Sequence, residues 1–175
     1  MKERFNSLVY CCAVALALDS KITSFLAKYT NITNNLACIV RSFESLEYLR
    51  VLAAVGVIIG MHLVEPYLSL TSSSTTTWEK LITAFPTLYQ DFSSVEPALL
   101  LDLTQPAFKF VSQERFSSCL YSEELLLPTK LIIESFRTEI LSVLRILLPK
   151  LAKGWERQSG QICQQIQKYK ICLVS

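Results

Sequence analysis

The sequence is poor in the residues that interrupt helices and in charge. It has 4 Gly, 6 Pro and 18% charged residues in a chain of 175. So few glycines and prolines argue against a disordered chain and against a turn-rich β fold. Charged residues usually reach about 25%, so we expect part of the surface to be covered by a second copy, a larger partner, a membrane or flanking sequence.

Sequence patterns of common catalytic and nucleotide-binding sites are also missing. The chain contains no phosphate-binding P-loop, no G-x-G-x-x-G and no G-x-S-x-G motif. It has a single histidine, His62, and no serine or cysteine is tied to it by a known spacing. We therefore expect a non-enzymatic protein without a cofactor and without specific nucleic-acid binding. The alternative is an enzyme that uses His62 together with Glu65, three residues further on.

Cysteine usage points to no metal site and no disulfide scaffold. None of the six cysteines forms a C-x-x-C pair, and their spacings match no zinc pattern. Their even number permits disulfides, but most of them stand where a small apolar residue would serve, so free, buried thiols are the default expectation. The six are Cys11, Cys12, Cys38, Cys119, Cys163 and Cys172.

The most apolar stretch is Val51–Met61, eleven residues without a charge or a polar side chain. A bilayer-spanning helix needs about 20 such residues. The stretch is also too long for one buried strand. It therefore predicts a helix over Arg50–Val64 that is buried nearly all round and ends at Glu65–Pro66, because the residue before proline avoids helical geometry.

Small residues mark one face of this predicted helix. Ala53, Gly56 and Gly60 lie three and four residues apart, and the two glycines form a G-x-x-x-G spacing. Each glycine lowers helix stability by about 1 kcal/mol, and close approach of a second backbone would offset that cost. We expect the three residues to be a helix-packing site in a protein core, with a membrane-embedded helix as the alternative.

The N-terminal residues allow two interpretations. Lys2 and Arg4 precede an apolar block that ends in Ala15-x-Ala17, as in a secretory signal, and Asn31 begins a glycosylation sequon. The same residues also have helical spacing from Phe5 to Lys28. We favour an ordinary first helix and an intracellular protein. The alternative is a secreted or membrane-associated protein in which Asn31 could carry a glycan.

Later segments resemble short helices separated by prolines. Prolines at positions 86, 97, 106, 128 and 149 predict an irregular helical globule rather than long rods. The best amphipathic pattern covers Thr129–Leu148, where apolar side chains from Ile132 to Leu147 share one side. We predict one helix there and a new segment starting at Pro149.

The C-terminal part is basic. From Leu144 onward there are six Lys or Arg and one Glu, whereas the rest of the chain is mildly acidic. Lys150, Lys153 and Arg157 fall on one side of a predicted helix, where they form a candidate face for an anionic partner. Residues 159–175 have weaker periodicity and are expected to be a loosely packed tail.

Together these observations predict an all-α protein: residues 1–175 as one domain, an irregular bundle of about six to eight helices around a buried central helix. A fragment of a larger protein is a second interpretation of the same single domain. The function we expect is that of a helical interaction or scaffold module that binds a protein partner or a second copy of itself. A membrane-associated or secreted helical protein is the alternative.

Overall fold

The computed structural model describes residues 2–29, 46–72, 90–118 and 121–174, and it contains no strand in these ranges. The predicted all-α fold is confirmed. The elements are α1 (Lys2–Ala17), α2 (Asp19–Tyr29), α4 (Leu46–Ile59), the π-helical turn η1 (Gly60–Val64), α5 (Glu65–Ser72), the 3-10 helix η2 (Pro97–Leu101), α7 (Gln113–Ser118), α8 (Glu123–Ser135) and α9 (Arg137–Val174).

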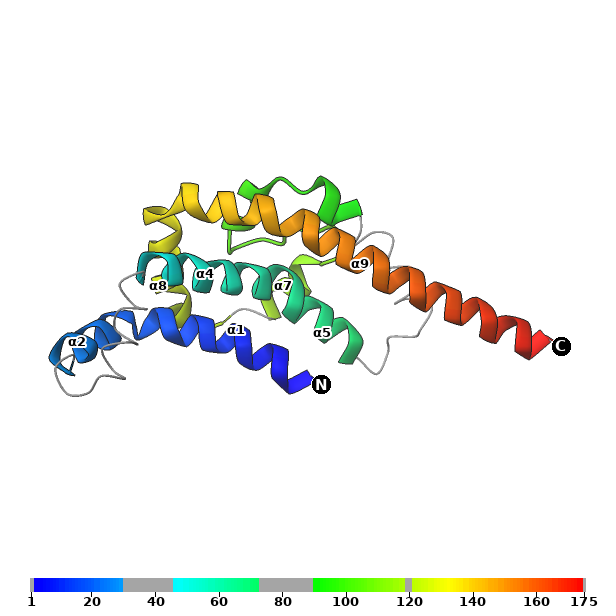
Figure 1. Cartoon of the computed structure of the whole chain (residues 1–175), viewed down its shortest axis with the longest axis horizontal. Helices are drawn as coiled ribbons and strands as arrows, with labels where there is room; N and C mark the ends of the chain where they lie inside the picture. The colour runs from blue at the N-terminus through cyan, green and yellow to red at the C-terminus, as the bar shows by residue number, and fades with distance from the viewer. Residues whose placement is uncertain (1, 30–45, 73–89, 119–120, 175) are drawn as a thin grey trace.

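Helix α4 lies between α1 and α9, with α8 also packed against it (Figure 1). Its inward side chains, among them Val57 and Ile58, are completely buried and belong to the hydrophobic core. Its outward side is more open than the sequence predicts, because Leu49 and Leu52 are each 38% exposed. The helix is therefore covered on several sides rather than buried nearly all round.

The helix does not end at Glu65–Pro66, so that prediction is wrong. The chain passes from α4 through η1 directly into α5, with Pro66 buried in the first turn of α5. A proline has no N–H to donate, and its ring collides with the carbonyl four residues earlier. The wider turn of η1, in which the Glu65 N–H donates to the Gly60 carbonyl, changes the local register and accommodates the ring.

Two further helix boundaries differ from the prediction. The pattern at Thr129–Leu148 is divided at Phe136, where φ is −123° and ψ is 34°, so α8 ends and α9 starts in a new direction. Pro128 and Pro149 do not separate helices, because each lies inside one. Helix α9 continues for 38 residues, and beyond the bundle its C-terminal half extends past the neighbouring labelled helices (Figure 1).

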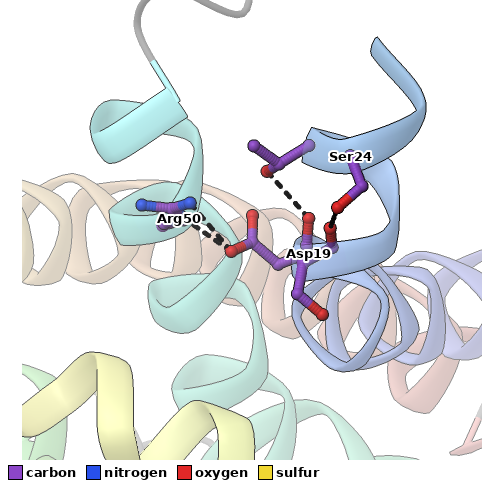
Figure 2. A network of polar contacts seen from close by, with 5 residues as sticks. Asp19, Ser24 and Arg50 are labelled. Carbon is purple, nitrogen blue, oxygen red and sulfur yellow. Dashed lines mark hydrogen bonds and ion pairs between the residues drawn. The ribbon is translucent and has the colours of Figure 1, made fainter. Parts of the chain in front are cut away.

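The first predicted helix, Phe5–Lys28, is likewise divided, at Leu18. Just after the break, the Asp19 carboxylate accepts a hydrogen bond from Arg50 Nε of α4 at 2.9 Å (Figure 2). Arg50 also forms an ion pair with the same oxygen, and both side chains are 26% exposed. The break thus lets α2 follow its own direction while a charged pair joins its first turn to α4.

Candidate functional site

The predicted basic face lies on the middle of α9. Lys150, Lys153 and Arg157 are all exposed there, and their spacing of three and four residues puts them on one side of the helix. None of them pairs with a carboxylate among the described side chains. Their charges are therefore available to an anionic partner.

Beside this face is an open cleft of about 360 Å³. It lies where the segment that leads into η2 runs alongside α9 (Figure 1). Residues from both segments line it: Phe92, Ser93, Val95, Pro97, Arg145, Leu148, Pro149, Ala152 and Lys153. The volume is at the small end of the range for ligand pockets, which is roughly 300–1,000 Å³.

The floor of the cleft is apolar, while its charged lining is entirely cationic. Phe92, Leu148 and Ala152 are buried core residues whose outer atoms reach the cleft. Arg145 and Lys153 are exposed, and no carboxylate belongs to the described lining. The described lining therefore combines an apolar surface with two exposed cations.

Pro149 interrupts the backbone hydrogen bonding of α9 beside the cleft. In an uninterrupted helix, the N–H of residue 149 would donate to the carbonyl of Arg145, but proline has no N–H. The Arg145 carbonyl therefore lacks its usual helical donor. Arg145 and Pro149 both belong to the lining of the cleft.

Sequence reasoning found Lys153 but missed the rest of the cleft. Arg145 has only a weak sequence signal, since it lies eight residues before Lys153, which places it about 80° around the helix from that residue. Phe92 and Val95 have no such signal, because only the tertiary fold brings them to α9.

His62 is a buried structural residue. Its Nε2–H donates to the Leu100 carbonyl at 3.0 Å, and its Nδ1 accepts from the Ala107 N–H at 3.3 Å. The ring also stacks on Phe116, with 5.1 Å between the ring centroids. Burial lowers the pKa of His62 from 6.5 to about 4, against smaller opposing effects of the Leu100 carbonyl and Asp102. The imidazole is therefore neutral at pH 7, and its hydrogen bonds join η1 to Leu100 of η2 and to Ala107 in the segment after η2.

The proposed pair of His62 and Glu65 does not form a site. His62 has no solvent-exposed surface, and both of its ring nitrogens are already occupied by backbone groups. Glu65 accepts a hydrogen bond from the Tyr121 hydroxyl at 3.0 Å instead. In the described part of the chain, no group of three or more His, Cys, Asp or Glu side chains is placed to hold a metal ion.

The small residues of α4 and η1 face α1. A Cβ atom built on Gly56 would lie 2.9 Å from Cys12 Sγ, and one on Gly60 would overlap the side chain of Val9. Ala53, one turn earlier, is half-buried against the core. The two glycines thus stand at the closest approach of α1, where larger side chains would separate the helices.

The remaining predicted features are the cysteines and the glycosylation sequon at Asn31. Cys11 and Cys12 are free thiols, but Cys11 is exposed, so the prediction of a buried thiol is wrong there. Helical spacing explains this, because residue 11 lies beside the packed side of α1 rather than on it. Asn31, Cys38 and Cys119 lie outside the described residues, and so do the side chains of Cys163 and Cys172.

One continuous helical stretch, Glu47–Ser69, has the length and composition of a membrane span. Its 23 residues include a window with a mean hydropathy of 1.8, half of which is buried inside the fold. The uncharged run Val51–Met61 is shorter than this helix, because Arg50 precedes it and His62 follows it. A buried core helix of a soluble protein meets the same criteria.

Comparison with protein-family models, with curated proteins and with solved structures finds no match for this chain.

Proposed function

We propose that this chain is a non-enzymatic helical interaction module that binds an acidic protein partner through the basic face of α9. The observation that carries the proposal is the exposed row of Lys150, Lys153 and Arg157 next to a cleft with an apolar floor. Protein interfaces often have this arrangement, in which an apolar centre is surrounded by a polar rim. The basic balance of the chain after Leu144 favours an acidic partner.

Nucleic acid is a poorer fit to this surface. Binding to nucleic acid relies on many phosphate contacts, with aromatic side chains available for stacking when the strand is single. The face offers three cations, and the aromatic ring at the cleft, Phe92, is only 3% exposed. A protein segment that brings both a carboxylate and an apolar side chain uses the whole surface.

Site-specific photo-cross-linking in the native cell tests the proposal. A photoreactive amino acid replaces Arg157 in the full chain, and cross-linked proteins are identified by mass spectrometry. We expect an acidic partner whose yield falls strongly when Lys150→Glu and Lys153→Glu are added. The matched control reverses the charge of two exposed lysines on other segments, with Lys21→Glu and Lys109→Glu. This control should leave the cross-linking yield unchanged. Equal losses in both variants, or no cross-link at all, would refute the proposal.

The same experiment distinguishes a second copy of the chain from a different protein. A cross-linked product at twice the mass of the chain would identify self-association. Several large apolar side chains are exposed, including Leu127 and Leu131 one turn apart on α8, and these would favour it. Sedimentation velocity of the purified chain then measures the same equilibrium in solution.

Membrane association is the second candidate function, and the continuous helix Glu47–Ser69 is the observation that favours it. Insertion would require this helix to exchange its protein contacts for lipid, although Val57 and Ile58 are already fully buried by protein. Extraction of cell membranes with alkaline carbonate tests the idea. Retention of the chain in the pellet would favour membrane insertion, and full release into the supernatant would exclude it.

A further inference from the structure

The cleft beside α9 has the features of a docking site for one particular kind of peptide. We propose that it binds a short acidic segment of a partner protein, which inserts one apolar side chain over Phe92, Leu148 and Ala152. This inference rests on the proposed function and adds the chemistry of the bound segment. Two features of the cleft lead to it, its charge and its size.

The charge of the cleft selects carboxylates. Arg145 and Lys153 are two helical turns apart on α9, so they flank the apolar floor from both ends. The nearest acidic residues in sequence are Asp91, which is buried and accepts a hydrogen bond from the Phe110 N–H, and the exposed Glu96 and Glu156. None of them belongs to the described lining. A segment with acidic residues on both sides of an apolar one would therefore place its charges next to both cations.

The size of the cleft limits the apolar part of the ligand. A volume of about 360 Å³, open on one side, suits a single large anchor such as Leu or Phe. The half-buried Val95 and Pro97 form one wall, and Pro149 belongs to the opposite helix. One anchored side chain surrounded by polar contacts is a common arrangement at the centre of protein interfaces.

Selection from a library of random displayed peptides on the immobilised full chain tests the inference. Counter-selection uses the double variant Arg145→Ala, Lys153→Ala. We expect enrichment of peptides with one Leu or Phe flanked by Asp or Glu. Enrichment of neutral or basic sequences, or no enrichment over the counter-selected variant, would overturn the inference. The selection does not use the partner identified by cross-linking. Failure of the peptide inference would therefore leave the proposed function to be decided by the cross-linking experiment.

Binding of the best enriched peptide is then measured by fluorescence anisotropy. We expect the double variant to weaken binding by about tenfold, because two exposed charge contacts with the peptide are lost. Arg137→Ala is the matched control, because Arg137 is an exposed cation of α9 that belongs neither to the basic face nor to the described lining, and it should change binding by less than about twofold. An equal loss from Arg137→Ala would show that positive charge on α9 attracts the peptide without the cleft.

Discussion

Gly60 of η1 lies against Val9 of α1 so closely that a Cβ atom would stand 2.7 Å from Val9 Cγ2 and even closer to Cγ1. Neither a β-branched side chain on a helix nor the adjacent backbone moves easily. The crossing of these two elements therefore depends on the missing side chain at position 60.

The first prediction compares the three helical glycines that can be assessed. Gly60→Ala should lower the free energy of unfolding by about 1–3 kcal/mol, because overpacking at Val9 exceeds the gain in helix propensity. Gly56→Ala meets only the mobile end of Cys12 and should cost less. Gly154→Ala has no neighbour within 4 Å of its added Cβ and should stabilise α9 by about 0.5–1 kcal/mol.

Urea unfolding followed by circular dichroism measures all three variants. Val9→Ala combined with Gly60→Ala should recover part of the loss, since both γ carbons are then removed. If Gly60→Ala were as stable as the parent chain, the close approach of α1 to η1 would be wrong.

The second prediction concerns acid. His62 has a pKa of about 4 in the folded protein and an ordinary value of 6.5 when unfolded, so the unfolded state binds the proton first. The stability supplied by the neutral ring is complete above pH 6.5 and is lost as the pH falls toward 4. Between pH 7 and pH 5 the loss should be about 2 kcal/mol.

Chemical denaturation at these two pH values measures the loss. His62→Gln should be less stable at neutral pH, because Gln cannot make both backbone hydrogen bonds of the ring. Its stability should nevertheless change less over the same interval. Asp102 also has a lowered pKa, chiefly through the hydrogen bond from the Thr104 hydroxyl, but it titrates below this window. If the stability of His62→Gln fell by the same amount as that of the parent chain between pH 7 and pH 5, groups other than His62 would cause the loss.

The third prediction concerns the pair of Asp19 and Arg50. A double-mutant cycle with Asp19→Asn and Arg50→Gln should give a coupling energy of about 0.5–1 kcal/mol, because both side chains are partly exposed. Added salt should reduce the coupling. A coupling of zero at low salt would mean that α2 is not held to α4 by this contact.

The fourth prediction concerns two adjacent thiols. Cys12 is half-buried, and this burial raises its pKa, as does the neighbouring Cys11 to a smaller extent. Iodoacetamide should therefore alkylate Cys11 several times faster than Cys12, because the thiolate is the reactive form. Tandem mass spectrometry of the labelled peptide separates the two positions. Faster labelling of Cys12 would contradict the packing of α1 on Gly56.

Local sequence determined the class of the fold and the basic face. Few glycines, apolar residues at helical spacing and a cluster of lysines near the end of the chain were enough to predict helices and to place Lys150, Lys153 and Arg157 on one side. These properties depend on residues within two helical turns of each other, so the spacing of residues along the sequence is enough to predict them.

Helix ends and long-range neighbours were decided by the tertiary structure. The apolar pattern continues unchanged across Phe136, although the chain turns there to pack α8 and α9 on the same core. In the sequence, Pro66 indicates the end of a helix. Only the structure shows the wider turn of η1 before it, through which the helix continues. Burial of His62 against Leu100, and the approach of Phe92 to α9, join residues far apart in sequence, so no local spacing could reveal them.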